Sequence, residues 1–371
     1  MEWIALDVFW RSLTAFVIVA ALVPASLPLT RMLGLYDVPG GRKQHEAPTS
    51  YIGGLLILLA VAVSFVVFDA QTNLVATTFL GCCGLLMVVG LLDDRFGLSW
   101  KVRIAMQIGA ALIMIYVAGV KAENLGDVFG YANLWMGWLA VPMTVFIVVG
   151  VINALNMIDG SDGLAGGQAL VSLVLFSAFA LYAGNTDMVM RLMTVAAAVA
   201  GFLVWNLRFP WQPRARIFLG NAGSMVLGFV IAWAAVRLTQ DAAHPVSPVL
   251  APWTIAIPLI DCVTLMFRRI QQGRSPFQAD RNHLHHMLLD AGFNPILIAW
   301  GLMIASLSLG LAAGLAVQQG IYRPVLVALF IILLLGYYDL TSDRARAVAM
   351  FRRLRGARTK PAAPGLDIIK P

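Results

Sequence analysis

Long apolar runs separated by short polar segments fill almost the whole chain. A helix needs about 20 mostly apolar residues to cross a bilayer. Eleven windows meet that requirement, at residues 8–30, 52–70, 74–92, 102–120, 135–157, 165–184, 188–207, 222–238, 250–267, 295–317 and 321–338. The pattern predicts an all-α, polytopic membrane helix bundle with about 11 transmembrane helices, forming a single domain over residues 1–340 with a basic tail at 341–371.

The positive charges give the predicted bundle a direction. Lysine and arginine gather in the cytoplasmic loops of membrane proteins. All but five of the 26 basic residues lie in alternate loops and in the tail, which predicts the N-terminus outside and the C-terminus inside. Five polar segments then share the cytoplasmic face, at about residues 31–51, 93–101, 158–164, 208–221 and 268–294. Because these segments hold the candidate chemistry, we expect a cytoplasmic active site at the membrane surface.

The composition excludes a water-soluble domain. Apolar residues make up 60% of the 371 positions and charged residues 12%, against about 45–50% and about 25% in soluble domains. The net charge of +7 does not indicate a nucleic-acid partner, because the basic residues form short clusters between apolar runs. Glu2 and Asp7 precede Arg11, unlike the basic start of a secretory signal, so we expect the first apolar run to be retained.

Two pairs of aspartates mark candidate metal or phosphate chemistry. Asp93 and Asp94 end an apolar window, where adjacent carboxylates are favourable only beside a cation or with one proton retained. Asp159 and Asp162 lie in NALNMIDGSDGLAGG, and their hard oxygens suit Mg²⁺, which shares itself with substrate phosphates. A solvated helix end is the alternative for the first pair, and a structural turn or a calcium loop for the second.

Amide and basic side chains offer further contacts to a substrate. Asn153 and Asn156 are three residues apart, so they share one helical face just before the second aspartate pair. In the first cytoplasmic segment, Arg42, Lys43 and His45 follow a Pro-Gly-Gly turn and are suited to gripping a lipid phosphate at the interface. Topology alone would also supply these basic residues.

Three histidines gather in the segment HLHHMLLDAGF. His283, His285 and His286 lie beside Asp280 and Arg281, so phosphate contact or proton handling is favoured, because imidazole titrates near neutral pH. Zinc binding and simple solvation are the alternatives. No Cys or Glu at zinc-protease spacing accompanies the histidines.

At these five segments the chain resembles the polyprenyl-phosphate N-acetylhexosamine-1-phosphate transferases, the glycosyltransferase 4 family, over nearly its whole length. The run SPFQADRNHLHH is most similar to the undecaprenyl-phosphate α-N-acetylglucosaminyl branch. The resemblance implies catalytic roles for Asp93 and Asp94 and binding of Mg²⁺ and nucleotide sugar by Asp159 and Asp162. The remaining matches are Asp37 in the first segment, Asp280 and Arg281 as substrate-binding residues, and His283, His285 and His286 as catalytic residues.

One position departs from the family pattern. The family reads GDxGS where this chain has Gly-Asn-Ala-Gly-Ser at 220–224, so Asn221 offers a neutral oxygen where relatives place a metal-binding carboxylate. We therefore expect Mg²⁺, with Mn²⁺ as a substitute, on Asp159, Asp162 and Asn221.

The resemblance implies transfer of GlcNAc-1-phosphate from UDP-GlcNAc to undecaprenyl phosphate, with release of UMP, in the bacterial inner membrane. This would be the first step of O-antigen or another surface polysaccharide. Another UDP-N-acetylhexosamine, a covalent aspartyl intermediate and a homo-oligomer all stay open. A transporter would place ionisable groups at mid-membrane, where only Asp261 lies clearly inside a window. That residue is about 10 Å along a helix from Arg268, within reach of the active site. A non-catalytic lipid-binding scaffold is the third alternative.

Overall fold

The computed structural model describes residues 2–37, 48–69, 73–130, 133–278 and 280–356. The helices are α1 (Glu2–Leu33), α2 (Gly53–Phe68), α3 (Leu74–Phe96), α4 (Trp100–Tyr116), α5 (Ala140–Ile158), α6 (Leu164–Tyr182), α7 (Thr186–Asn206), α8 (Gly220–Thr239), α9 (Ala251–Thr254), α10 (Ala256–Gln271), α11 (Leu284–Asp290), α12 (Pro295–Gln318), α13 (Arg323–Leu340) and α14 (Arg344–Leu354). The other described elements are the 3-10 turns η1 (Gly137–Leu139) and η2 (Pro248–Leu250) and the strands β1 (Tyr36–Asp37) and β2 (Thr49–Ser50).

Every predicted window falls on a helix or on the α9–α10 pair. Within the described ranges, eight helices are long and apolar enough to cross a membrane, and α9 with α10 makes a ninth if the bent pair is one span. The windows at 52–70 and 102–120 fall on α2 and α4, which have 16 and 17 residues. The class, an all-α multi-pass membrane protein, is confirmed, and the count of eleven spans stays a prediction.

The window at 250–267 was predicted to be one continuous helix, and that prediction is wrong. The chain bends by 82° between α9 and α10. Pro258 has no N–H to donate to the carbonyl of Thr254 four residues earlier, and its ring crowds that carbonyl, so the helix breaks there. Ser172 of α6 donates its hydroxyl to the Thr254 carbonyl at 2.8 Å, which satisfies a backbone group that lipid could not.

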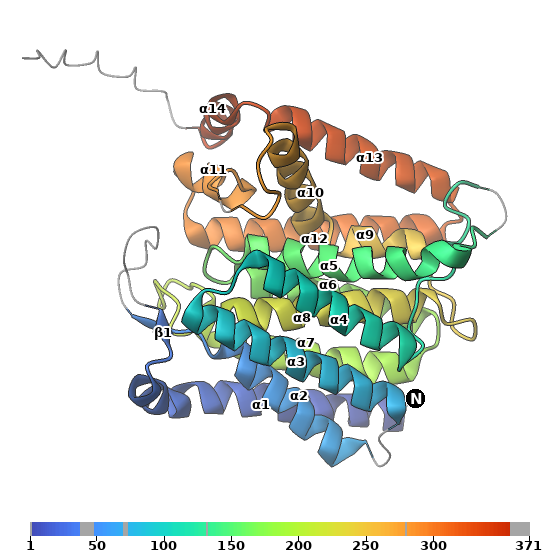
Figure 1. Cartoon of the computed structure of the whole chain (residues 1–371), viewed down its shortest axis with the longest axis horizontal. Coiled ribbons are helices and arrows are strands. Elements are labelled where there is room, and N and C mark those ends of the chain that lie inside the picture. Colours follow the sequence, from blue (N-terminus) through green and yellow to red (C-terminus); the bar gives the residue numbers. More distant parts are fainter. Residues whose placement is uncertain (1, 38–47, 70–72, 131–132, 279, 357–371) are drawn as a thin grey trace, which may run out of the picture.

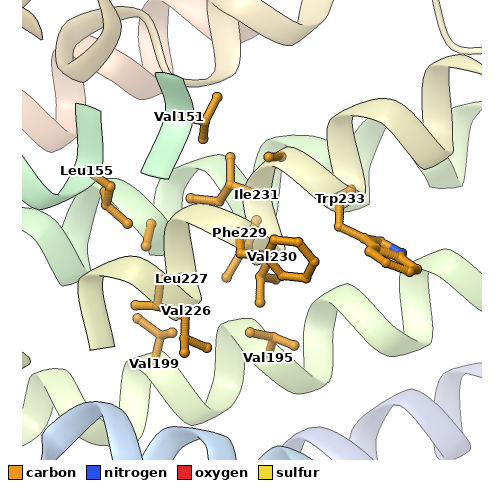
Figure 2. Packing of buried hydrophobic residues seen from close by; sticks show 14 of the residues in the cluster. Val151, Leu155, Val195, Val199, Val226, Leu227, Phe229, Val230, Ile231 and Trp233 are labelled. Atoms are coloured by element: carbon orange, nitrogen blue, oxygen red, sulfur yellow. The ribbon is translucent and has the colours of Figure 1, made fainter. Parts of the chain in front are cut away.

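Helix α8 lies at the centre of the bundle, and most of its side chains are buried. Figure 2 shows them packed against Val151 of α5 and Val199 of α7. Glycines bring two further helices close, because a Cβ added to Gly54 of α2 would lie 2.2 Å from the Cα of Gly223. A Cβ added to Gly90 of α3 would lie 2.2 Å from the Cα of Ala222, also in α8. Such small residues permit close helix approach where lipid supplies no hydrophobic drive.

The polar segments meet at one end of the bundle. Strands β1 and β2 are antiparallel, with Asp37 opposite Thr49. Ser50 bridges to Ile217 in parallel, and Gly53 donates its N–H to the carbonyl of Phe218 at 3.1 Å. The first polar segment is thereby tied to the segment that precedes α8. Figure 1 shows β1, α11 and α14 at the left end of the bundle, opposite the N-terminus.

Candidate active site

The carboxylate of Asp94 caps the N-terminus of α8 at the polar end of the bundle. Its Oδ1 accepts the backbone N–H of Asn221 at 2.9 Å, and its Oδ2 accepts that of Ala222 at 3.3 Å. Gly220 permits this approach, because its φ is 76° and a Cβ there would lie 2.7 Å from the Asp94 Oδ2. Since a carboxylate is stabilised at a helix N-terminus, α8 fixes the direction in which Asp94 points.

Two of the predicted aspartates are paired with arginines. Asp93 is buried, and its Oδ2 lies 3.0 Å from Nη1 of Arg103 on α4. Asp162 accepts a hydrogen bond from Nε of Arg208 at 2.7 Å and from the backbone N–H of Ala215 at 3.0 Å. These contacts neutralise both carboxylates, and those of Asp162 tie the third polar segment to the fourth.

Asp159 is the carboxylate left available for a ligand. It ends α5, is half-buried, and has no hydrogen bond to its side chain among the described residues. Burial, together with the negative charges of Asp94 and Asp162, raises the pKa of Asp159 to about 7. A cation bound at Asp159 would offset the negative charges of these two neighbours and favour the ionised carboxylate.

The predicted asparagines bind protein groups on two different helices. Asn153 donates to Oε1 of Gln107 on α4 at 2.7 Å. Asn156 donates to Oδ1 of Asn221 at 3.0 Å and to the hydroxyl of Ser224 at 2.8 Å. Asn221, predicted as a metal ligand, therefore already uses one lone pair of its carbonyl oxygen to hold α5 against α8.

The histidine segment begins with a buried hydrogen bond between an imidazole and a carboxylate. His283 donates from Nδ1 to Oδ2 of Asp261 at 2.8 Å, and both side chains are buried. The same carboxylate accepts the backbone N–H of Leu284 at 3.1 Å, so it also begins α11. Asp261, placed by its sequence position within reach of the site, does contact the histidine segment.

His285 joins the histidine segment to the aspartate segment. A Cβ added to Gly160 would lie 2.7 Å from Nε2 of His285, so the ring packs directly on the backbone beside Asp159. Both ring nitrogens of His285 and Nδ1 of His286 are buried without a hydrogen-bond partner among the described residues. Burial, reinforced by the charges of His286 and His283, lowers the pKa of His285 to about 3. At neutral pH this ring is uncharged and able to bond a ligand.

Asp280 and Arg281, predicted to bind substrate, have protein partners. Asp280 accepts Nε of the buried Arg269 at 2.9 Å. Burial alone would raise the pKa of Asp280, but the bonds from Arg269 and from the backbone of Asn282 lower it overall. Arg281 is exposed and lies 3.7 Å from Asp290. Arg281 therefore stays accessible to a ligand, whereas Asp280 braces the loop.

The first polar segment is described only in part. Asp37 lies in β1, and its negative charge acts on the hydroxyl of Tyr51, whose pKa is raised chiefly by burial. Tyr51 lies beside the start of α8, because its carbonyl would be 2.6 Å from a Cβ on Gly220. The predicted lipid-phosphate contacts Arg42, Lys43 and His45 lie outside the described residues.

The donor set fits a divalent cation that is shared with a substrate. In the described part of the chain, no three His, Cys, Asp or Glu side chains surround one metal position. Asp94 and Asp162 nevertheless each place negative charge near Asp159, whose side chain accepts no hydrogen bond from the described residues. Mg²⁺ seldom uses an all-protein cage and completes its shell with water and phosphate oxygens. A cation held by Asp159 with one neighbour would satisfy this chemistry.

An apolar groove of about 970 Å³ extends from Gln240, at the C-terminal end of α8, to Phe277 in the fifth polar segment. Helices α4, α5, α8 and α10 supply its walls, for example through Ile108, Phe146, Ile231 and Leu259. Phe277 lies at one limit and stacks on Trp100, with ring centroids 5.1 Å apart. Both halves of the broken helix line this groove, α9 through Ala251 and Pro252 and α10 through Leu259 and Cys262.

Several residues of the site carried no motif. Gln107, Arg103 and Arg208 each bind a predicted residue, but a polar or basic residue in a loop or helix is too common to single them out. Tyr337 of α13 bonds Asp261 from 76 residues away. Only Asp261 gave a signal, since a lone carboxylate in an apolar window is rarely without a role.

Comparison with known proteins agrees with this geometry. Glycosyl transferase family 4 matches residues 76–239. Undecaprenyl-phosphate alpha-N-acetylglucosaminyl 1-phosphate transferase of Escherichia coli K12 is 34% identical over 344 residues, which cover 91% of this chain and 92% of that protein. The Yersinia pestis protein of the same name is 35% identical over 88% of this chain and 90% of its own. The chain belongs to glycosyl transferase family 4.

Proposed function

We propose that this protein transfers GlcNAc-1-phosphate from UDP-GlcNAc to undecaprenyl phosphate and releases UMP. Relatives named for that activity match this chain over most of their length. The observation that supports it in the structure is the meeting of the Asp94, Asp159 and His285 segments next to an apolar groove. Such a site offers charge neutralisation to a pyrophosphate and an apolar surface to a polyprenyl chain.

The aspartates suit the donor pyrophosphate. Phosphoryl transfer depends on alignment and charge neutralisation more than on covalent help from the protein. Mg²⁺, held by Asp159 together with Asp94 or Asp162, would polarise and orient the pyrophosphate. The exposed Arg281 and the neutral, unpartnered His285 are suited to bonding phosphate oxygens on the other side.

The acceptor lipid suits the groove. A phosphate monoester has a second pKa of about 6, so undecaprenyl phosphate is largely dianionic at neutral pH and needs no strong base. The polyprenyl chain would lie along the apolar wall formed by α5 and α10, with its phosphate near Phe277 and the aspartates. Direct attack of the lipid phosphate on the β-phosphorus then requires only that both phosphates be held in line.

We further propose eleven spans, with the N-terminus outside, the C-terminus inside, and the active site on the cytoplasmic face of a bacterial inner membrane. The positions of 26 basic residues support this orientation, and the donor is a cytoplasmic nucleotide sugar. The product would be the first lipid-linked intermediate of a surface polysaccharide.

Incubation of the purified protein with labelled UDP-GlcNAc and undecaprenyl phosphate tests the function. We expect label in the lipid fraction and an equal amount of UMP, both abolished by a chelator and restored by Mg²⁺. Asp159→Asn should lose at least about tenfold in turnover, equal to about 1.4 kcal/mol of barrier. The matched control is Asp187→Asn, in the first turn of α7, which should retain wild-type turnover.

Three results would contradict the proposal in different ways. Lipid-linked product from another UDP-N-acetylhexosamine but not from UDP-GlcNAc would contradict the proposed sugar donor and leave the reaction type unchanged. Passage of substrate across vesicles without chemistry would indicate a transporter. Lipid binding with neither product nor transport would indicate a scaffold.

A further inference from the structure

Asp261 is a helical residue whose carboxylate is buried within the membrane bundle. Asp261 lies in α10, and 3% of its surface is exposed. A charge placed there is costly unless each lone pair is satisfied. Three donors satisfy it, because His283 donates from Nδ1 at 2.8 Å, Leu284 from its backbone N–H at 3.1 Å, and Tyr337 from its hydroxyl at 2.5 Å.

The bond to Asp261 Oδ2 fixes the tautomer of the His283 ring, and the other two bonds hold the Asp261 carboxylate in place. A carboxylate only accepts hydrogen bonds, so Nδ1 of His283 carries a proton. In the neutral ring, Nε2 is then the acceptor and the lone pair lies on the side away from Asp261. The rings of His285 and His286 lie at centroid distances of 5.7 and 6.4 Å from His283. The ring therefore belongs to the same cluster as the imidazole that packs beside Asp159.

Tyr337 is itself held in place from the other side. Arg268 of α10 donates to the carbonyl of Thr341 at 2.6 Å and to its hydroxyl at 2.9 Å, and it also bonds the carbonyl of Tyr338. These contacts fasten the end of α13 to α10. The hydroxyl of Tyr337 is thus presented to Asp261 by a rigid pair of helices.

We propose that Asp261 and Tyr337 are positioning residues, which hold His283 in its Nδ1-protonated form and direct its Nε2 toward the transferring phosphate. This inference rests on the proposed function for the identity of the substrate. Neither residue touches the substrate. An orienting carboxylate behind an imidazole is a general device, since it fixes the tautomer and the ring angle. The position of Leu284 on the same carboxylate fixes the start of α11 as well.

The gentler test is Tyr337→Phe, with Tyr338→Phe as its matched control. Tyr338 is the next residue of α13, and its hydroxyl bonds the exposed Gln271 instead. We expect Tyr337→Phe to lower kcat about three- to tenfold with KM for UDP-GlcNAc within twofold, because only the orientation of His283 is loosened. Tyr338→Phe should leave kcat and KM unchanged.

The second test is Asp261→Asn, read by ¹⁵N spectra of ring-labelled histidine. The chain has five histidines, so the His283 signals are assigned by their loss in His283→Gln. We expect the wild type to show a protonated Nδ1 and an acceptor Nε2 at His283. In Asp261→Asn the mixture should shift toward the other tautomer, with kcat lowered at least about tenfold. Asp261→Glu, which retains a carboxylate, should restore the wild-type spectrum at least in part.

The outcomes separate this inference from the function itself. Wild-type kcat in both Asp261→Asn and Tyr337→Phe, or an unchanged tautomer in Asp261→Asn, would overturn the positioning role. If Asp261→Asn fails to fold, the kcat of Tyr337→Phe relative to Tyr338→Phe decides whether the positioning role holds. The ring spectrum of the wild type needs no substrate, so a failed transfer assay would count against the function and leave the tautomer result intact.

Discussion

Asp159 is the residue whose chemistry depends most on its neighbours. It carries a carboxylate without a hydrogen-bond partner in the described chain, and its pKa is raised to about 7 by burial and by the charges of Asp94 and Asp162. Because the folded state binds this proton more tightly than the unfolded state, Asp159 stabilises the metal-free protein at low pH. That stabilisation is lost as the pH rises from about 4 through about 7.

Thermal unfolding of the metal-free protein in detergent measures this linkage. We expect Asp159→Asn, which stays neutral at every pH, to be more stable than the wild type at pH 8. The difference should shrink steadily as the pH falls to 5. Asp187→Asn, in the first turn of α7, serves as the control for removal of one negative charge. A difference in Tm that is the same at pH 8 and pH 5 would show that Asp159 does not titrate in this range.

Asn221 gives a prediction about metal affinity. Its side chain already holds Asn156, and its backbone N–H holds Asp94. Asn221→Asp keeps an acceptor for Asn156 and adds a charge in the first turn of α8, where the helix dipole favours it. We expect a lower Mg²⁺ concentration for half-maximal rate, since a charged oxygen binds a hard cation more strongly. Identical Mg²⁺ titrations of both forms would exclude position 221 from the metal site.

The residues of the site were easier to predict from the sequence than their roles. Dense polar motifs at the ends of apolar windows marked Asp94, Asp159 and His285, which the structure brings to one end of the bundle. Spacing could not show that Asp280 would be bonded to a buried Arg269. The partners of each group come from distant helices, and a local pattern contains no information about them.

At the scale of elements, the break between α9 and α10 depends on a contact from another helix. The carbonyl of Thr254 loses its usual donor because of Pro258 and is satisfied by the hydroxyl of Ser172. Hydropathy treated the whole window as one helix, because the residues on both sides of the break are apolar. The proline was visible in the sequence, but only the position of α6 decides whether a broken helix can be satisfied.

Ser172→Ala should therefore lower the stability of the protein, and Ser177→Ala should leave it unchanged. Both serines are buried on α6 and each hydroxyl faces a carbonyl of its own helix, but only that of Ser172 also bonds Thr254. Loss of the bond to Thr254 should cost about 1 kcal/mol, a typical value for a hydrogen bond in a membrane bundle. Thermal unfolding in one detergent compares the two variants. Equal stability would mean that the Thr254 carbonyl finds another donor.

At the scale of the molecule, α8 gives the bundle an axis that links the two ends. The site lies at its N-terminus, where Asp94 bonds Asn221. At its other end, Gln240 accepts the backbone N–H of Asn124 at 2.9 Å. A helix of 20 residues spans about 30 Å, the thickness of the apolar part of a bilayer. Asn124 and the site therefore lie on opposite faces of any membrane that α8 crosses.

The C-terminal helix lies on the same side as the site. Arg344 and Arg352 of α14 bond Asp290 at the end of α11, and a Cβ on Gly292 would lie 2.2 Å from Arg355. Gly356, the next residue, is thus fixed near the histidine segment. If the site uses a cytoplasmic nucleotide sugar, Gly356 must be cytoplasmic and Asn124 periplasmic. The basic residues of the chain predict the same orientation independently.

Reporter fusions at these two positions test the arrangement as a whole. A periplasmic phosphatase fused after Asn124 should be active, and the same enzyme fused after Gly356 should be inactive. A fluorescent protein that matures only in the cytoplasm should show the reverse pattern. Because α8 and α14 connect each reporter to a known end of the bundle, an active phosphatase after Gly356 would show that the whole protein has the opposite orientation. The aspartates would then face away from the nucleotide pool, and the proposed reaction could not occur in the cell.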